Sequence, residues 1–497
     1  MQIGRLRIDN NAFQIAVTLT ATLLPRLGLF LFYGPVMTPD SYGYRGFAEI
    51  VLKSSDWLRD AGLNTSPMPI LAFRSLGYPL IVATTMVFGG PAWPYFLVAL
   101  QYAVSLCTTA FVFRLAKEFG LSPWTAVFAS ITFATSLQLT FDQCVLTDSL
   151  HASAIIIAFC LISCSVLIRR SISLSTAAVS GVLFATAFLL REVLQFLVIV
   201  VFPLLLVAIL ATRRGERWRT AISCIAVLLP LILSVSAYKG WNTYRTGYSF
   251  VTTGGQATPL YALMQAARND PLIFSDSTPL DAMVRKMLRT YEPQEMVDIN
   301  SALFREGYQA PQIAQMATAH FFKTWIERPL SMLRLLRISV SASALKLVFR
   351  PITALCDAAS WARDVNQCYE YRSMYRKLFN LEFRLPWREW VSLLAMTAQN
   401  VISVLISALF YLGVPIIFAR SVVAGERDLA TWTVGAFWAA FVGWYLAYAA
   451  TYFEDRYMAP MIPFIALGGL YVARTILNTR KIRRPRHSDA AMQAAAD

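Results

Sequence analysis

The chain has 497 residues, of which 57% are hydrophobic and only 15% are charged. This much apolar side chain excludes a disordered protein, and 7 cysteines over such a length exclude a small disulfide-bonded scaffold. Many apolar residues with few charges are typical of a membrane protein. The formal net charge of +15 then has to be explained by membrane topology or by a nucleic-acid partner.

Ten stretches are apolar and long enough to cross a bilayer, whose core of about 30 Å takes roughly 20 helical residues. They are 13–34, 95–113, 122–141, 149–168, 172–190, 193–211, 219–238, 390–417, 430–450 and 458–476. The first is expected to be a retained helix rather than a signal peptide, because no small-residue cleavage pattern follows it. The shorter stretch 77–90 contains Pro79 and is expected at the membrane interface. The sequence predicts an all-α polytopic membrane protein with about ten transmembrane helices.

Basic residues in the short connections predict the orientation, because such loops stay on the cytoplasmic side. They fall on alternate connections: Arg5 and Arg7, Arg114 and Lys117, Arg169 and Arg170, and Arg213, Arg214, Arg217 and Arg219. This pattern accounts for much of the net charge, and no stretch interleaves basic and aromatic residues as nucleic-acid-binding modules do. We therefore expect a cytoplasmic (inner) membrane protein with a cytoplasmic N-terminus and no nucleic-acid partner.

The stretch 331–350 decides the parity of the crossings. The tail 480–497 begins with a basic run, RKIRRPR, and is expected in the cytoplasm, which requires an even number of spans. Arg334, Arg337 and Lys346 interrupt the stretch, so we interpret it as an interfacial amphipathic helix. The alternative, that it spans together with a further crossing, stays open.

Four regions follow from this topology. Residues 1–238 form an N-terminal transmembrane module with a catalytic first loop, 35–77. Residues 239–388 form an extracytoplasmic helical region that includes the interfacial helix 331–350. Residues 389–479 form the C-terminal transmembrane helices, and 480–497 form the cytoplasmic basic tail.

Asp40, just after the first span, is the first candidate functional residue. Asp40, Tyr44 and Ala48 follow the spacing i, i+4, i+8 and share one face of a short predicted helix that starts near Pro39. The alternative is that Asp40 merely caps this helix, since Asp is among the best N-cap residues.

Other charged residues are expected on the same membrane face. Arg26 lies inside the first span, where an unpaired cation is expensive. The remaining ones stand at the outer ends of spans: Arg74, Asp142, Asp148, Arg191, Glu192, Glu454, Asp455 and Arg456. Acids and arginines thus converge on one side of the membrane.

These residues resemble the C-type (GT-C) glycosyltransferases, a class that includes the protein O-mannosyltransferases and the aminoarabinose transferase of lipid A. The matching positions are Arg26, Asp40, Tyr44 and Ala48, then Arg74, Gly77, Tyr78 and Pro79, then Gly181 and Arg191, and finally Arg456, Tyr457, Pro460 and Pro463. Leu76 replaces a frequent proline, and Ser41 stands where a second acid often follows the first. This second departure leaves dependence on a divalent cation (Mg or Mn) undecided.

The resemblance implies transfer of a sugar from a polyprenyl-phosphate donor to a cell-envelope acceptor, which is a lipopolysaccharide or other lipid, a glycan or a protein. Asp40 is the expected general base, since partial desolvation raises a carboxyl pKa. Arg74, Arg191 and Arg456 are candidates for the donor phosphate, although each is equally explained as a snorkelling arginine. Asp148 either assists the acceptor or a cation, or pairs with an arginine. Supporting positions are Arg26, Tyr44, Tyr78, Glu454, Asp455 and Tyr457.

Three further points limit the interpretation. The glycines of Thr252–Thr253–Gly254–Gly255 are interpreted as an ordinary turn, and no phosphate-binding loop of the P-loop type is present. Cys356 and Cys368 would face an oxidising compartment and could pair. A membrane transporter or flippase of lipid-linked or small polar solutes, and a glycan polymerase, remain the alternative functions.

Overall fold

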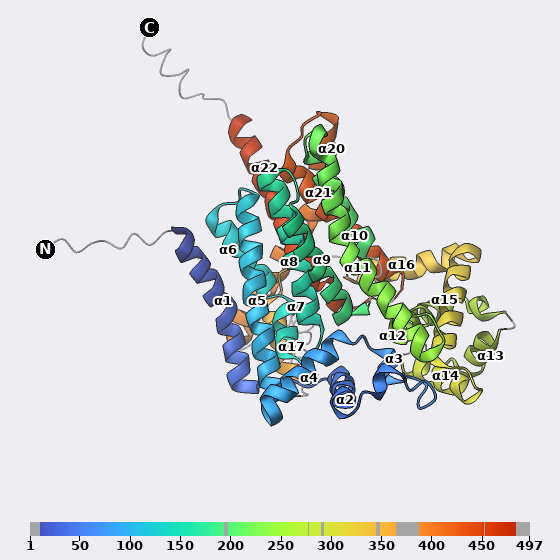
Figure 1. The fold of residues 1–497 in the computed structure, drawn as a ribbon. Coiled ribbons are helices and arrows are strands. Elements are labelled where there is room, and N and C mark those ends of the chain that lie inside the picture. The colour runs from blue at the N-terminus through green and yellow to red at the C-terminus, as the bar shows by residue number, and fades with distance from the viewer. Residues whose placement is uncertain are drawn as a thin grey trace, which may run out of the picture.

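The structure is a computed structural model that describes residues 10–192, 197–276, 278–289, 293–343, 348–363, 387–451 and 453–483. Throughout these residues the regular elements are helices (Figure 1). Cys368 and the basic tail beyond residue 483 lie outside them. The protein is an all-α polytopic membrane protein, as the sequence predicts.

The ten predicted spans all fall on apolar helices of the bundle. Seven helical stretches in the described part of the chain are long and apolar enough to cross a membrane, and three shorter apolar helices accompany them. The bundle helices are α1 (Asn10–Tyr33), α5 (Trp93–Glu118), α6 (Pro123–Ala134), α7 (Leu137–Gln143), α8 (Asp148–Arg169), α9 (Leu174–Leu190), α10 (Leu197–Ala211), α11 (Arg217–Thr246), α19 (Trp387–Ala408), α20 (Val414–Val423), α21 (Leu429–Ala449) and α22 (Ile462–Arg483).

Two predicted segments differ in detail from the helices that the structure forms there. The span 122–141 is divided into α6 and α7, because the Ser136 side chain accepts a hydrogen bond from the Gln138 N–H (3.3 Å) and starts a new helix. The stretch 77–90 forms α4 (Gly77–Gly89), which tolerates Pro79 in its first turn. Gly90 (φ 50°) then turns the chain into α5, since glycine adopts positive φ without a steric cost.

Helix α8 lies at the centre of the bundle and is buried along most of its length. It packs against α5 and α9, and α9 in turn packs closely on α11. A Cβ on Gly181 of α9 would lie 2.8 Å from the carbonyl oxygens of Ala226 and Val227 on α11. Gly181 is therefore explained by helix packing, in the way that small residues allow close contact between membrane helices.

One end of the bundle carries short helices and a separate helical region (Figure 1). We call it the α2 end, and the opposite end, with α20 and the start of α21, the α20 end. The helices of the α2 end include α2 (Pro39–Lys53), α3 (Ile70–Phe73), α12 (Thr253–Ala267), α13 (Pro279–Met287), α14 (Pro293–Arg305), α15 (Ala310–Glu327), α16 (Pro329–Ser343) and α17 (Pro351–Arg363). A second apolar core, which includes Leu263, Val284, Leu303 and Ile313, holds α12 to α15 together.

Helix α16 covers the first part of the stretch 331–350. It has 15 residues and is not among the apolar helices suited to crossing the membrane. Its Leu330, Leu333 and Ile338 are exposed. The interfacial position of this helix stays a prediction.

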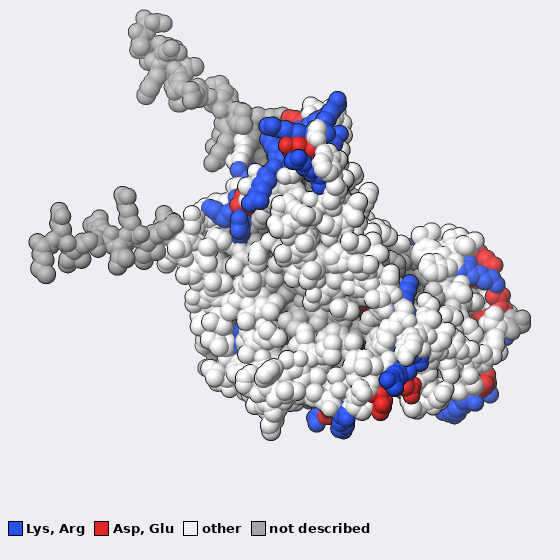
Figure 2. All heavy atoms as spheres, viewed as in Figure 1, with Lys and Arg blue, Asp and Glu red and all other residues white. Residues whose placement is uncertain are grey.

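Charge is distributed unevenly over the surface. Figure 2 shows Lys, Arg, Asp and Glu gathered at the two ends, with a mostly uncharged zone between them. Large apolar side chains are exposed on the bundle helices, such as Leu31 and Phe32 on α1 and Leu233 on α11. An exposed apolar belt of this kind is suited to contact with lipid chains.

Candidate active site

A cavity of about 220 Å³ opens at the α2 end between the bundle and the helical region. Its walls come from segments that are far apart in the sequence. The lining residues are Asp40, Tyr44, Phe73, Arg74, Asp148, Arg191, Glu192, Gly254, Gly255, Thr258, Tyr261, Met296, Arg456 and Tyr457. The fold therefore brings together the principal residues predicted for the site: both carboxylates, Asp40 and Asp148, and all three candidate phosphate ligands.

Asp40 is held by two arginines rather than by its own helix. Arg74 Nη2 donates to Asp40 Oδ1 at 2.6 Å, and Arg456 Nη1 donates to Asp40 Oδ2 at 3.1 Å. The start of α2 is stabilised instead by Ser41, whose Oγ accepts from the Thr38 N–H at 2.8 Å. Because each of its oxygens accepts from a guanidinium, the Asp40 carboxylate is oriented by side chains and not by a cap.

The expected direction of the Asp40 pKa shift is wrong. Burial of Asp40 does act to raise its pKa, as the sequence argument assumed. The charges and hydrogen bonds of Arg74 and Arg456 outweigh burial, so the pKa lies below the usual carboxyl value of 3.8. Asp40 is therefore ionised at neutral pH but engaged by both arginines.

Arg74 is supported by Tyr44, which lies on the predicted face of α2. Its guanidinium lies 4.8 Å from the centre of the Tyr44 ring, and Nη1 donates to Tyr44 Oη at 3.3 Å. Tyr44 packs edge-on against Tyr78 at 4.9 Å between ring centres. Tyr44 and Ala48 are both buried, which confirms the helical face predicted for α2. The buried Tyr78 thus supports the site from beneath and does not line the cavity.

Asp148 and Arg191 form a second ion pair in the cavity wall. Asp148 opens α8, and Arg191 follows the last residue of α9. The Arg191 guanidinium also lies 4.6 Å from the centre of the Tyr457 ring. The structure therefore agrees with the alternative in which Asp148 pairs with an arginine, while leaving both side chains at the cavity.

Glu454 and Asp455 have different partners. Glu454 pairs with Arg456 Nε and so holds this arginine beside the cavity. Asp455 Oδ2 lies 3.3 Å from Arg350 Nη1 and is not in the cavity lining formed by the described residues.

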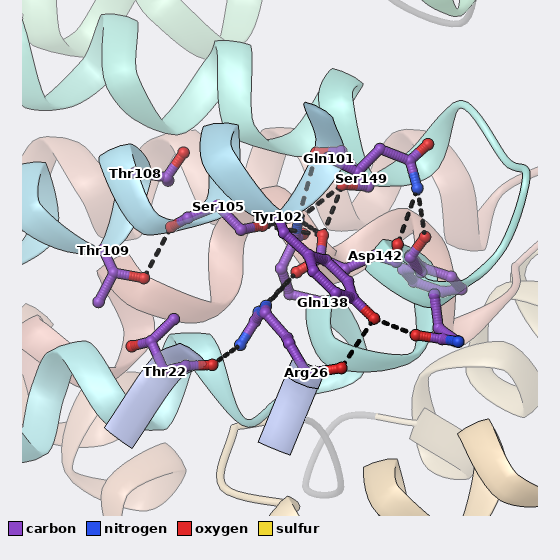
Figure 3. Close-up of polar contacts among 12 residues, drawn as sticks. Thr22, Arg26, Gln101, Tyr102, Ser105, Thr108, Thr109, Gln138, Asp142 and Ser149 are labelled. Carbon is purple, nitrogen blue, oxygen red and sulfur yellow. Dashed lines mark hydrogen bonds and ion pairs between the residues drawn. The ribbon is translucent and has the colours of Figure 1, made fainter. Parts of the chain in front are cut away.

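Arg26 lies inside the bundle, away from the cavity lining. Its Nε donates to Asp142 Oδ2 at 2.8 Å, and both side chains are fully buried (Figure 3). The other oxygen of Asp142 accepts from Ser105, Gln138 and Ser149 at 2.5–2.8 Å. The need of Arg26 for a partner in the membrane is thus met by a structural ion pair, which corrects its predicted place at the site.

The Gly254–Gly255 turn belongs to the cavity lining, although the sequence indicates only an ordinary turn. It lies at the start of α12 and lines the cavity. A Cβ on Gly254 would lie 2.6 Å from the Phe73 carbonyl oxygen, so glycine is required for this close approach. The signal in the sequence is Thr252 before two glycines at a helix start, since the Thr252 side chain accepts from the Gly255 N–H at 3.3 Å. Glu192, Tyr261 and Met296 also line the cavity, and no motif marks Tyr261 or Met296.

The partners of the two predicted carboxylates of the cavity, Asp40 and Asp148, are arginines. Both oxygens of Asp40 and one oxygen of Asp148 already contact arginines. Among the described residues, the group of acidic and histidine side chains close enough to share a metal ion is Asp276, Asp281 and His320, outside the cavity lining. Asp276 of that group pairs with Lys323 at 2.6 Å.

Comparison with known proteins gives only distant similarities. No protein-family model matches the sequence, and a search of curated proteins finds no significant match. Among solved structures, the archaeal oligosaccharyltransferase AglB from Archaeoglobus fulgidus, in complex with an inhibitory peptide and a dolichol-phosphate, aligns with a TM-score of 0.43 and 9% identity over 98% of this chain and 52% of its own. The apo crystal structure of the Archaeoglobus fulgidus oligosaccharyltransferase aligns with a TM-score of 0.32 and 12% identity over 81% of this chain and 56% of its own.

Both neighbours are oligosaccharyltransferases. This chain spans about half the length of each. TM-scores and identities this low carry no functional argument, so function has to be argued from the residues of the site.

Proposed function

We propose that the cavity at the α2 end is the active site of a glycosyltransferase that moves a sugar from a polyprenyl-phosphate donor to a cell-envelope acceptor. The observation that supports this most is the Asp40 carboxylate held between Arg74 and Arg456 in the wall of a cavity at one end of the apolar bundle. A donor with a lipid tail and a phosphate needs access from the bilayer and cations at the bond that breaks. This cavity lies at one end of the apolar bundle and offers arginines.

The arginines are suited to the leaving phosphate. A guanidinium binds phosphate oxygens through paired N–H groups, and such donors stabilise the charge that develops as the bond to the sugar breaks. The donor phosphate competes with Asp40 for Arg74 and Arg456, since both anions use the same N–H groups. Donor binding therefore frees the carboxylate and raises its pKa, because its charged form loses two favourable partners.

The chemical step follows from these roles. Asp40 accepts the proton of an acceptor hydroxyl, and the hydroxyl oxygen forms a bond to the anomeric carbon of the sugar. The bond between that carbon and the phosphate oxygen breaks, and polyprenyl phosphate leaves with the electron pair. Arg191, held by Asp148, stands beside the same cavity and assists in binding the phosphate or the acceptor.

We place this face outside the cytoplasm, on the side predicted from the basic loops. Cys356, near the α2 end, is disulfide-bonded, and disulfides form in oxidising compartments. A reporter active only in the cytoplasm is expected to work when fused after Arg486 and to fail when inserted at Gly307 in the helical region. Activity at Gly307 would reverse the orientation.

The test of function is transfer of a labelled sugar. Purified protein is incubated with a radiolabelled polyprenyl-phosphate sugar and envelope extract, and label in the extract is measured after the lipid is removed. A parallel reaction with a nucleotide sugar is expected to give no transfer. Movement of the lipid across vesicle membranes without transfer would support a transporter, and products of increasing length would support a polymerase. The glycan missing from a deletion strain would identify the acceptor.

A further inference from the structure

A second cavity lies at the α20 end of the bundle, opposite the proposed active site. It encloses about 310 Å³ between the ends of α8 and α10 and the starts of α11 and α21. Its lining residues are Arg170, Val207, Leu210, Ala211, Thr212, Arg213, Arg214, Arg217, Arg427, Leu429 and Trp432. Arginine is thus the commonest residue of the lining.

The arginines of this cavity outnumber the acids beside them in the sequence, which are Glu216, Glu426 and Asp428. Among the described residues, no ion pair is formed by Arg170, Arg213, Arg214, Arg217 or Arg427. Of the two acids adjacent to Arg427, Asp428 is engaged elsewhere, because it caps α21 and accepts from Tyr471 Oη at 2.7 Å. The other, Glu426, forms no ion pair with the described residues. Figure 2 shows blue side chains prevailing at this end of the molecule. Such a set of guanidinium groups is suited to an anion with several oxygen acceptors.

One arginine of the cavity has a backbone conformation that glycine adopts at a lower free-energy cost. Arg170, which follows α8, has φ 57° and is the non-glycine residue with positive φ in the described chain. A side chain in this left-handed region costs free energy, and helices usually end there with glycine. Thr212 Oγ1 donates to the Arg170 carbonyl at 2.9 Å and so ties this turn to the end of α10. Membrane topology explains basic residues at this end, but it does not explain a strained arginine at a cavity wall.

The lining also contains apolar side chains. These are Val207, Leu210, Ala211, Leu429 and Trp432, and Leu210 is 40% exposed. A ligand that satisfies both kinds of side chain carries a phosphate and an apolar chain. A soluble phosphate would satisfy only the arginines.

We propose that this cavity binds the phosphate of an anionic phospholipid whose acyl chain lies against the apolar side chains of the lining. The arginines contact the phosphate oxygens, and Trp432 lies at the level where aromatic residues meet the lipid headgroups. This binding site is separate from the proposed active site and does not depend on the proposed function.

The main experiment compares two triple variants with the same loss of charge. Arg213→Gln, Arg214→Gln and Arg217→Gln are combined in the first. The matched control combines Lys117→Gln, Arg219→Gln and Arg420→Gln. These residues lie near the end of α5, the start of α11 and the end of α20, and they do not line the cavity. Delipidated full-length protein is titrated with phosphatidylglycerol, and with phosphatidylcholine for comparison, by native mass spectrometry.

Wild type and control are expected to bind one phosphatidylglycerol more tightly than phosphatidylcholine, and the cavity variant to bind it at least about tenfold more weakly, as lost charge-assisted hydrogen bonds would predict. Equal weakening in both triple variants would show nonspecific attraction of charge and overturn the proposal. Displacement of phosphatidylglycerol by an equal concentration of inorganic phosphate would show a soluble-phosphate site and overturn the lipid assignment.

Arg170→Gly provides a test that does not depend on loss of structure. Glycine suits φ 57°, so the melting temperature is expected to stay the same or rise while phosphatidylglycerol affinity falls. Unchanged affinity in this variant would remove Arg170 from the site and, together with an unaffected triple variant, would refute the site itself.

Discussion

The two cavities at opposite ends of α8 both contain arginines but differ in their partners. At the α2 end, Arg74, Arg191 and Arg456 each contact a carboxylate. At the α20 end, the five arginines of the cavity form no ion pair with any described residue. The 22 residues of α8 separate the two by about 33 Å at 1.5 Å per residue.

This difference teaches that arginine content alone does not define a phosphate site. An arginine paired with a carboxylate is held in place before substrate arrives, and its acid is available for chemistry once an anion competes for the guanidinium. Arginines without acids attract an anion that stays. The first arrangement is suited to turnover and the second to stable binding.

The buried ion pair of Arg26 and Asp142 extends the comparison to the stability of the protein. Arg26→Met removes a buried cation and leaves Asp142 as an uncompensated buried charge, which typically costs about 3–5 kcal/mol. We expect a large fall in the free energy of unfolding, measured with denaturant in detergent. Arg45→Met is the control, because Arg45 and Glu49 form an exposed pair whose loss costs roughly 0.5 kcal/mol. Equal, small losses in both variants would contradict the structural role of Arg26.

The arginines of the proposed active site are expected to act on donor use rather than on folding. Arg74→Ala and Arg456→Ala should each lower kcat/KM for the lipid donor. The expected loss of transition-state stabilisation is about 1.5–3 kcal/mol, which is the contribution of a hydrogen bond to a charged group. Lysine at either position should restore activity only in part, because an ammonium lacks the guanidinium fork. Arg350→Ala, which breaks the pair with Asp455, should leave donor kinetics unchanged. Normal donor kinetics in a folded Arg74→Ala protein would make that arginine structural.

A smaller effect is expected on the pH dependence. Arg74 and Arg456 favour the charged form of Asp40 and hold its pKa below 3.8. The kcat/KM of the wild type should therefore fall only at a pH below the one at which an enzyme with an ordinary carboxyl base would lose activity. In Arg74→Gln one cation is gone, the pKa rises, and the acid limb should move to higher pH. The profile of Arg350→Gln should not move. An acid limb that stays in place in Arg74→Gln would mean that Asp40 is not the group titrating.

The sequence predicted the parts of the structure that depend on simple periodicity and charge. The ten spans follow from runs of apolar residues, and the buried face of Tyr44 and Ala48 follows from helical spacing. The meeting of Asp40 with Arg74 was predictable only as convergence on one face. Its consequence for the pKa was not, because the sign depends on whether burial or two arginines 2.6 and 3.1 Å away prevail.

Other features depend on contacts between distant segments that no local pattern marks. Arg26 needs a partner in the membrane, but which acid it finds depends on how α7 packs against α1. Gly254 resembles an ordinary turn residue until Phe73 is placed against it. The left-handed conformation of Arg170 likewise could not be predicted, because an arginine at the end of a membrane helix is already explained by topology.

The most direct test of the account is the turnover of Asp40→Asn. Asparagine has the same shape and can still accept from an arginine, but it cannot take a proton, so purified Asp40→Asn should keep a near wild-type melting temperature and lose about 10²–10⁴-fold in transfer of the lipid-linked sugar. Asp455→Asn is the control and should keep its activity, while Asp148→Asn should be impaired less than Asp40→Asn. A folded Asp40→Asn enzyme that retains more than about a tenth of wild-type turnover, well above the range for a lost base, would contradict the assignment of Asp40 as the general base.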